Sequence, residues 1–487
     1  MIRSATRAAV LVGALVFSIG LVGQALAAVP LTTVSTDPYT NSSSYHATQV
    51  EPDTFASGST IVSTFQSGRF EDGGASNLGW ATSTDGGSSW THGFLPQTTV
   101  FATPAGPWAR ISDPSVAFDP KHGVWMISGL AINSAAVGKA VIVNRSRDGL
   151  TWQRPVTVSK GGGADFYDKD WIACDGTPSS PFYGNCYVEW DNANAGNVLM
   201  MARSTDGGRH WTMSNTPSAA VIGGQPVAQP NGNVVVPIDD AFEGSVEAFV
   251  STNGGASYTG PNTVSSLQTH FVAGNLRTDA LPSAAVDASG TVYVAWQDCR
   301  FRSSCSANDI VFSTSTDGVH WSAVKRVPFA ATSSPMDFFI PGIDVQPGTS
   351  GSTAHVGVAS YAYTNKSCNT STCQLEVVFS SSTNGGATWS STTTVLGPLK
   401  LTWLPLTNQG YMVGDYISTS FAGSNAFPVV ANATAASCSQ NVVGSCNEFM
   451  VAPTSGLAAT GGSRPAGTRP VAGARSDHPQ GGAKTAF

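Results

Sequence analysis

The chain has 487 residues, of which only 11% are charged, and its formal net charge is −7. An average soluble domain carries about 25% charged residues, so Ser, Thr, Gly and Asn supply much of the polarity, as is typical of an extracellular β-protein with many turns. The negative balance argues against a nucleic-acid partner, because such a partner requires a basic face.

The N-terminus has the pattern of a secretory signal peptide. Arg3 and Arg7 precede an apolar run over residues 8–22, and Ala25-Leu26-Ala27 is a small-x-small cleavage site. The run is too short to anchor the chain, and no other apolar stretch reaches the length of a membrane span. We therefore predict a signal peptide over residues 1–27, a secreted mature protein and no membrane span.

One short stretch is written six times along the chain. "STDGGSSW" is the first copy, and the copies begin at residues 83, 146, 204, 251, 315 and 382. Each copy lies between two apolar-rich runs, and Asp-Gly or Asn-Gly between such runs is a strong hairpin signal. The repeat therefore predicts six hairpin turns.

Two further strands precede each of these hairpins. The stretches 114–130 and 283–298 both show a strand, a turn and a second strand. Four antiparallel strands in each repeat, at this spacing, predict an all-β β-propeller of four-stranded blades over residues 28–452. We predict seven blades, the last closed by three C-terminal strands and one N-terminal strand at 30–36; six blades with extra strands is the alternative.

All eight cysteines come as near neighbours along the chain. An even number in a secreted chain predicts disulfides, here 174–186, 299–305, 368–373 and 438–446. The rival interpretation is a metal site, but no pair has the CxxC spacing or a nearby His.

Residues 453–487 differ in composition from the rest of the chain. They are rich in Gly, Ala, Pro and Arg and poor in large apolar residues. Such a segment cannot build a core, so we predict that this tail is disordered.

The repeated stretch resembles the Asp-box, also called the bacterial neuraminidase (BNR) repeat, of the sialidase superfamily, with the pattern Ser-x-Asp-x-Gly-x-Thr-Trp. The resemblance covers about residues 40–452 and implies a sialidase-like propeller with the boxes on its rim, away from the active site. It therefore gives the box aspartates a structural role, which suits a side chain that accepts backbone hydrogen bonds within its own turn. These aspartates are Asp85, Asp148, Asp206 and Asp317.

Polar residues recur at the start of the first strand of most predicted blades. The end of the second strand returns to the same face, so charges there are expected near the same pocket mouth. The charged residues and the tyrosine at these two places are Glu51, Asp53, Arg69, Arg110, Asp113, Asp168, Lys169, Asp170, Glu189, Asp191, Arg277, Asp279, Asp298, Arg300, Asp337, Asp415 and Tyr416. The alternative is a ring of structural ion pairs and turn caps.

The family resemblance implies an arginine clamp for a sugar carboxylate, a Tyr–Glu nucleophile pair and an Asp acid/base. The catalytic candidates by position are Tyr416, Glu51, Glu189, Asp53 and Asp113. The substrate-binding candidates are Arg69, Arg110, Arg277, Arg300, Asp170, Asp279 and Asp415. The Arg-Ile-Pro motif that opens the first blade of sialidases is absent from this chain.

These features predict a secreted, sialidase-like glycoside hydrolase that removes terminal sialic acid or a related residue from a glycan. A propeller that binds glycan or protein without catalysis is the main alternative, and a lyase or other polysaccharide-cleaving enzyme is the third. Fold alone does not choose among them. We predict a monomer with a glycan partner and no cofactor or metal; convergence of Asp residues alone would instead favour Ca²⁺ in the channel.

Overall fold

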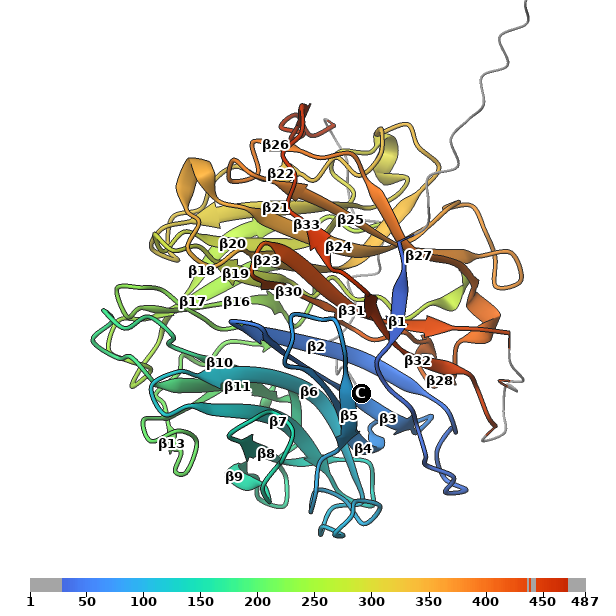
Figure 1. Ribbon diagram of the computed structural model, residues 1–487. Coiled ribbons are helices and arrows are strands. Elements are labelled where there is room, and N and C mark those ends of the chain that lie inside the picture. Colours follow the sequence, from blue (N-terminus) through green and yellow to red (C-terminus); the bar gives the residue numbers. More distant parts are fainter. Residues whose placement is uncertain (1–28, 436–437, 439–443, 472–487) are drawn as a thin grey trace, which may run out of the picture.

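The computed structural model describes residues 29–435, 438 and 444–471, and this part of the chain is all-β apart from single turns of 3-10 helix (Figure 1). None of its helices is long and apolar enough to cross a membrane. The signal peptide predicted over residues 1–27 lies outside the described residues.

The strands follow one another in antiparallel sheets, and each sheet uses strands in chain order. The first contains β2 (Gln49–Ser57), β3 (Thr60–Arg69), β4 (Ala75–Ser83) and β5 (Thr91–Phe94). The second contains β6 (Arg110–Asp119), β7 (Val124–Ile132), β8 (Gly138–Ser146) and β9 (Val156–Lys160). A single pair, Ala75 opposite Ile111, joins these two into one eight-stranded sheet.

Four more sheets repeat this order along the chain. The third contains β10 (Tyr167–Cys174), β11 (Cys186–Asn192), β12 (Val198–Ser204) and β13 (Thr212–Met213). The fourth contains β14 (Val221–Ile222), β15 (Val227–Ala228), β16 (Val234–Asp240), β17 (Ser245–Ser251) and β18 (Thr259–Ser266). The fifth contains β19 (Ser283–Val286), β20 (Val292–Asp298), β21 (Asp309–Ser315) and β22 (Lys325–Arg326). The sixth contains β23 (Asp337–Val345), β24 (Val356–Tyr363), β25 (Gln374–Ser382) and β27 (Thr393–Lys400).

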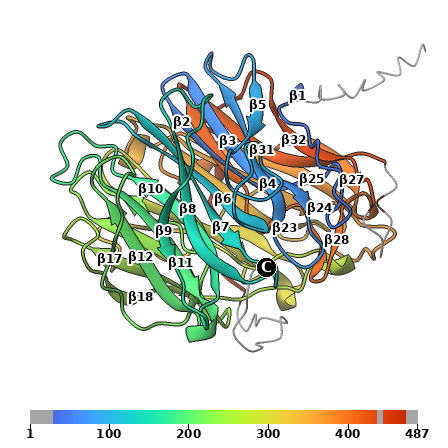
Figure 2. The ribbon, with the colours of Figure 1, turned by 90° about the horizontal axis from the view of Figure 1, so that it is seen from below.

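The last sheet joins the two ends of the described chain. Three C-terminal strands, β30 (Ser418–Ala422), β31 (Asn425–Ala433) and β32 (Glu448–Pro453), lie side by side. The N-terminal β1 (Leu31–Thr33) adds to β32, with Leu31 opposite Pro453 (Figure 2). This pairing covers the outer edge of β32, which would otherwise be open to other chains.

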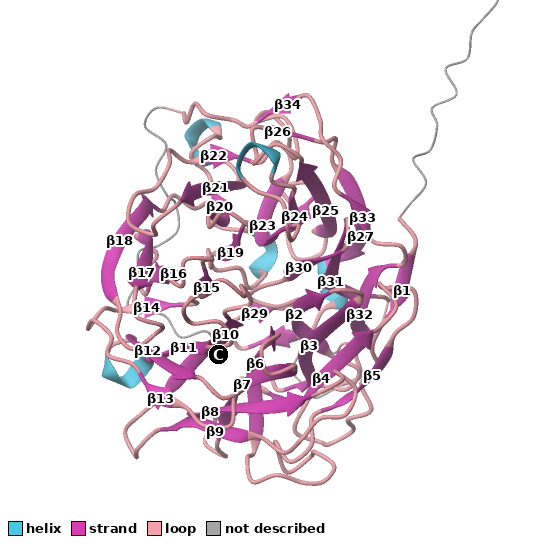
Figure 3. Cartoon of the chain, turned by 60° about the vertical axis from the view of Figure 1, so that its left-hand side comes forward, coloured by secondary structure: helices cyan, strands magenta, loops and turns pink. Residues whose placement is uncertain are grey.

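The innermost strands of successive sheets touch in turn. β2 contacts β6, and the contacts continue through β10, β15, β19, β23 and β30 back to β2. Figure 3 shows these strands around the middle of the molecule, with strands such as β9 and β18 toward the outside. The apolar core fills the spaces between sheets; for example, Leu78 on β4 packs with Ile127 on β7. Each sheet is open-edged in itself.

Side chains also join neighbouring innermost strands by accepting hydrogen bonds from backbone N–H groups. The acceptor and the residue whose N–H it binds are Asp53 with Val116 (2.7 Å), Ser115 with Ile172 (3.3 Å), Gln225 with Ala284 (2.9 Å), Ser283 with Ile343 (3.2 Å) and Asp344 with Phe421 (2.8 Å). These bonds satisfy donors that no strand ladder reaches.

The six repeated stretches are hairpin turns, which confirms that prediction. In the first, the Ser83 hydroxyl donates to Asp85 (2.8 Å) and accepts from the Gly87 N–H (2.8 Å). Asp85 in turn accepts from the N–H of Ser89 (2.9 Å), and the Trp90 indole donates to the Gly87 carbonyl (3.1 Å). The repeat thus closes its own turn by local hydrogen bonds.

The last repeat also ties its sheet to the one before it. Trp389 is fully buried, and its ring centroid lies 5.7 Å from that of Phe312 on β21. Gly386 in the same turn has φ +80°, and a Cβ there would lie 2.7 Å from the Phe312 ring. The turn therefore requires glycine at this point both for its backbone and for this packing.

All four predicted disulfides are present: 174–186, 299–305, 368–373 and 438–446. Each closes a short loop of its own. Disulfides in this number are typical of proteins that fold in an oxidising compartment.

The tail predicted to be disordered from residue 453 is partly built into the fold. β33 (Leu457–Ala458) pairs with β31, and β34 (Arg464–Pro465) pairs with β26 (Thr388–Trp389). The N–H of Val471 donates to the Arg300 carbonyl (2.7 Å). Composition misplaced this boundary because these short pairs use backbone groups and need few apolar side chains; residues 472–487 lie outside the described residues.

Replacing Trp389 by Ala is expected to lower the free energy of unfolding by about 3–5 kcal/mol, because it empties a fully buried ring site between two sheets. Trp90 holds the same place in the first turn but is only half-buried, so Trp90→Ala is the matched control with a smaller loss. Chemical denaturation followed by circular dichroism measures both. Equal losses would show that inter-sheet packing of the ring is not what stabilises the last turn.

Candidate functional site

The innermost strands carry a β-bulge at one common level. The register shifts between Val50 and Asp53 in β2, and the same irregularity occurs in β6, β10 and β23. The bulged residues are left-handed: Glu51 (φ 55°), Asp113 (49°), Lys169 (56°) and Ile340 (53°). Non-glycine residues in this region cost about 1–3 kcal/mol each and cluster at functional sites. Three of the four carry a charge.

These bulges help gather a group of charged side chains, here called the central ionic cluster. Its members are Glu51, Arg69, Asp113, Asp168, Lys169, Asp170, Glu189, Asp191, Arg277 and Asp415, and none is more than 3% exposed. Electrostatic interactions link them around the axis, from Asp415 and Arg69 through Glu51 and Asp113 to Lys169 and Glu189. Seven carboxyl groups thus face three cationic side chains, so the cluster has acid in excess.

The best-formed ion pair of the cluster joins Arg277 and Asp415. Arg277 Nε donates to one carboxylate oxygen of Asp415 at 2.6 Å, and Nη2 donates to the other. Fork-on-fork pairs of this kind are strong and directional. Arg69 lies close enough to Arg277 for their charges to repel, and its Nη1 donates to the Gly74 carbonyl at 2.9 Å.

Neutral polar groups connect the acids of neighbouring sheets. Gln66 Nε2 donates to Glu51 Oε2 and, at 2.9 Å, to the Ser112 hydroxyl. Ser112 in turn donates to Asp113 at 3.2 Å, and the Lys169 N–H donates to the other oxygen of Asp113 at 3.0 Å. Glu51 and Asp113 are therefore held by one chain of hydrogen bonds.

Burial dominates the titration of these acids. It raises the pKa of Glu51 to about 8, with help from the charges of Asp415 and Asp113 and against those of Lys169 and Arg69. Burial likewise raises the pKa of Asp113 to about 6, and here the Lys169 charge opposes it most. The pKa values of Asp170, Glu189 and Asp191 are raised well above the ordinary range for the same reason.

Tyr416 sits between the cluster and the third sheet. Its hydroxyl donates to the Pro114 carbonyl at 3.1 Å, and its ring meets Trp171 edge-on with centroids 5.0 Å apart. The Lys169 ammonium lies 3.6 Å from the Tyr416 ring centroid and has no hydrogen-bond partner among the described residues. Burial raises the pKa of Tyr416 well above its usual value.

A cavity of about 220 Å³ adjoins the cluster at Arg277, and Phe271, Asp279 and Gln409 also line it. The segment 267–282, which joins β18 to β19, forms one wall. It is docked onto the loop before β30, since Leu276 bridges to Tyr411 and the Arg277 N–H donates to the Tyr411 carbonyl at 2.8 Å. The cavity is the approach to the cluster from this side.

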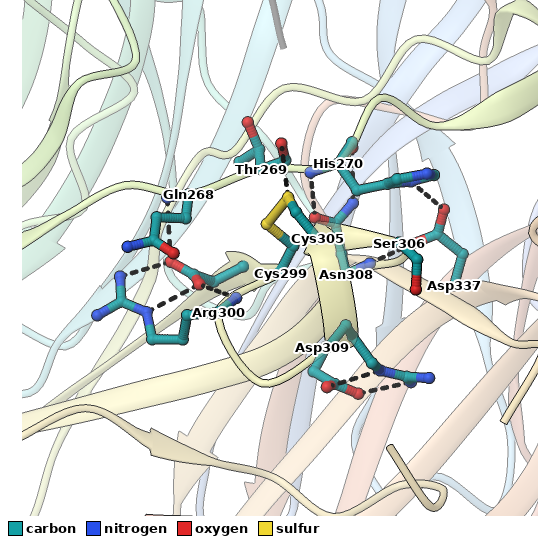
Figure 4. The surroundings of a disulfide bond; sticks show 12 residues. Gln268, Thr269, His270, Cys299, Arg300, Cys305, Ser306, Asn308, Asp309 and Asp337 are labelled. Atoms are coloured by element: carbon teal, nitrogen blue, oxygen red, sulfur yellow. Dashed lines mark hydrogen bonds and ion pairs between the residues drawn. A yellow bond between two sulfur atoms is a disulfide. The ribbon is translucent and has the colours of Figure 1, made fainter. Parts of the chain in front are cut away.

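Three of the predicted site residues have other partners. Arg110 pairs with Asp72 at 2.5 Å, and its guanidinium carbon lies 4.1 Å from the Phe70 ring centroid. Arg300 lies beside the 299–305 disulfide (Figure 4), where its Nε donates to Asp298 at 2.8 Å.

Asp53 is the third, and it serves as the link to Val116 already described. Burial raises its pKa to about 7. The other site predictions are placed in or next to the cluster: Glu51, Arg69, Asp113, Asp170, Glu189, Arg277, Asp279, Asp415 and Tyr416.

Sequence reasoning left Gln66, Ser112 and Lys169 out of the candidate set. Lys169 was visible, because it stands at the start of a first strand like Glu51 and Asp113. Gln66 and Ser112 carried no signal, since neutral polar residues are common throughout this chain. Within residues 29–435, 438 and 444–471, no group of three or more His, Cys, Asp or Glu side chains is arranged to hold a metal ion.

No protein-family model and no curated protein matches this chain. Among solved structures, a protein of unknown function from Dyadobacter fermentans shares 16% identity over 69% of this chain and 95% of its own, with a TM-score of 0.44. A Hadza microbial sialidase shares 16% identity over 65% of this chain and 63% of its own, with a TM-score of 0.44. A Trypanosoma rangeli sialidase in complex with sialic acid shares 12% identity over 84% of this chain and 70% of its own, with a TM-score of 0.44. At these values the similarities assign no substrate and no residue role to this chain.

The raised pKa values predict that stability falls as pH rises from about 5 to 8. Folded Glu51, Asp53 and Asp113 hold protons up to about pH 8, 7 and 6, whereas the unfolded carboxyls lose theirs near pH 4. Each such group lowers the free energy of unfolding by up to about 1.4 kcal/mol per pH unit. Hydrogen bonds from Ser89 lower the pKa of Asp85 to about 2, so this rim carboxylate stays ionised throughout the window.

Melting temperatures at pH 5, 6, 7 and 8 test this expectation. The parent should melt higher at pH 5 than at pH 8, and Glu51→Gln should flatten the upper part of the curve. Asp72→Asn, which removes an exposed carboxylate, is the control and should keep the parent's slope. A melting temperature that rises from pH 5 to 8 would contradict the buried-acid assignment.

Proposed function

We propose that this chain is a secreted glycoside hydrolase whose acid and base are Glu51 and Asp113. The observation that carries the proposal is this carboxyl pair: both residues stand on left-handed bulges of adjacent innermost strands, and their pKa values are displaced to about 8 and about 6. Two carboxyl groups whose surroundings push their pKa values apart are the usual acid and base of glycoside hydrolysis.

The proposed scaffold is a β-propeller of seven blades. The order of the sheets supports it, because the contacts between innermost strands run from β2 to β30 and return to β2. The sheet shared by β1 and the three C-terminal strands supplies the seventh blade and favours seven over six. The four disulfides and the predicted signal peptide support secretion.

The proposed chemistry uses each carboxyl in its prevailing state at neutral pH. Protonated Glu51 gives its proton to the glycosidic oxygen as the bond from that oxygen to the anomeric carbon breaks. Ionised Asp113 either attacks the anomeric carbon or takes a proton from the water that does. Gln66 positions Glu51 by donating to Oε2, which leaves the other oxygen for the proton.

The charge balance favours a neutral sugar at the cleaved position. The cluster has seven carboxyl groups against three cations, and the fork of Arg277 is already filled by Asp415. A substrate carboxylate would have to displace Asp415 and meet the remaining acids. Like charges at such short range are costly in a buried site.

A sialidase-type reaction is the second candidate, and one observation favours it. Arg69 and Arg277 lie together, and Tyr416 interacts electrostatically with Glu51, so a two-arginine clamp and a Tyr–Glu pair are available. In that reaction Tyr416 is the nucleophile and Glu51 its base, which reverses the role of Glu51. The two candidates therefore differ in their dependence on Tyr416.

Hydrolysis of fluorogenic neutral hexosides and of a fluorogenic sialoside by the purified full chain separates these candidates. Under the proposed chemistry a neutral hexoside is turned over, and Glu51→Gln and Asp113→Asn each lower kcat by about 10²–10⁴-fold. Tyr416→Phe keeps activity within about tenfold of the parent. Glu376→Gln, on the outer part of the sixth sheet, is the control and should match the parent.

Three results would count against the carboxyl pair. Preference for the sialoside with collapse in Tyr416→Phe would favour the sialidase-type reaction. Unchanged turnover in Asp113→Asn would move the base elsewhere. Folded protein that turns over no substrate but binds glycans would favour the non-catalytic propeller.

The pH profile gives an independent check on the acid and base. Activity should fall below about pH 6, where Asp113 gains a proton, and above about pH 8, where Glu51 loses its proton. A plot of kcat/KM against pH for the preferred substrate should therefore be bell-shaped with its maximum between these values. A profile that keeps rising beyond pH 8 would exclude Glu51 as the acid.

A further inference from the structure

A second cavity, of about 480 Å³, lies at the edge strands of the first two sheets. It is lined by Gln97, Trp108, Ile142, Arg154, Pro155 and Thr157, with small residues of the 105–107 turn at one end. None of these residues belongs to the central ionic cluster. Its volume falls within the range of small-molecule sites, about 300–1,000 Å³.

The aromatic wall of this cavity is held in place by a stapled loop. The loop between β5 and β6 is closed by the Val100 N–H donating to the Trp108 carbonyl (2.8 Å) and the Gly106 N–H donating to the Thr99 carbonyl (2.7 Å). A Cβ on Gly106 would lie 2.3 Å from the Gln97 carbonyl oxygen, so only glycine permits this closure. Trp108 packs partly against the core beside Ile142 and remains half-exposed. The indole is therefore presented in a fixed position.

The cavity is positively charged in a chain whose overall charge is negative. Exposed Arg154 lines it, and the ammonium of exposed Lys160 lies 5.9 Å from the Trp108 ring centroid. No carboxylate is among its lining residues in the described chain. With a net charge of −7 over the whole sequence, this local reversal of sign concerns one small surface.

We propose that this cavity is a second, non-catalytic binding site for an acidic saccharide, a sugar ring that carries a carboxylate or a sulfate. The flat face of Trp108 offers a surface for the C–H face of the ring. Arg154 provides a planar fork that matches a carboxylate or sulfate, and Lys160 provides a second positive charge. The Gln97 amide supplies both a donor and an acceptor for ring hydroxyls.

This site goes beyond the proposed hydrolysis and does not depend on it. The catalytic proposal favours a neutral residue at the cleaved bond, whereas this surface selects an anionic residue elsewhere on the glycan. A glycan held here is kept at a high local concentration near the protein. The site therefore predicts retention on mixed glycans that contain both neutral and acidic residues.

The test is calorimetric titration of the full chain with three tetrasaccharides at low salt. Hyaluronan supplies carboxylates, chondroitin sulfate supplies carboxylates and sulfates, and chitotetraose is the neutral control. Binding of at least one acidic probe and not of chitotetraose is expected, and added salt should weaken it by screening. The comparison of the two acidic probes separates carboxylate from sulfate recognition.

Variants locate the binding on the molecule. Trp108→Ala should weaken binding about tenfold, because it removes the central aromatic contact. The double variant Arg154→Ala/Lys160→Ala should weaken it about fivefold, and both side chains are exposed, so the fold is kept. Lys121→Ala, another exposed lysine, and Glu51→Gln should bind like the parent.

Two outcomes would overturn the site. One is a parent protein that binds neither acidic probe, or binds chitotetraose equally well. The other is an Arg154→Ala/Lys160→Ala variant that binds as tightly as the parent, whatever the behaviour of Trp108→Ala. Loss of binding in Glu51→Gln alone would place the acidic saccharide at the central cluster instead.

Discussion

The innermost strand of each sheet has one edge without a neighbouring strand, and that edge is buried in the middle of the molecule. Its backbone N–H groups still need acceptors. Side chains of the preceding sheet supply them: Asp53 serves Val116, Ser115 serves Ile172, and the pattern continues around the molecule. This requirement explains why acidic and hydroxyl residues recur at one level of otherwise apolar strands. It also sets how each sheet sits against the next.

The same level carries the chemistry. Left-handed bulges at Glu51, Asp113 and Lys169 add a residue to each strand and bring charged side chains together at the centre. Burial of so many acids costs stability, and the raised pKa values record that cost. The rim turns and the rings packed between sheets, such as Trp389 on Phe312, stabilise the arrangement from outside. A site of this kind is stable only because the surrounding sheets are well packed.

The sequence predicted the level of the site better than its members. Glu51, Asp113, Arg277 and Asp415 come together because strand direction and blade order place them there. Arg110 and Arg300 start from similar positions but turn to local carboxylates, Asp72 and Asp298. A long side chain takes the nearest partner of opposite charge, and loop conformation decides which partner that is. Periodicity carries no information on that choice.

The sequence by itself determined the hairpin turns, the strand order and the four disulfides, because each depends on residues close together in the chain. An Asp-Gly turn closes with hydrogen bonds inside eight residues, as at Ser83 to Trp90. Only the tertiary structure decided the pKa values of Glu51 and Asp113 and the pairing of residues 457–465 with strands of the last two sheets. Desolvation and long-range pairing depend on groups hundreds of residues apart, and their positions exist only in the folded chain.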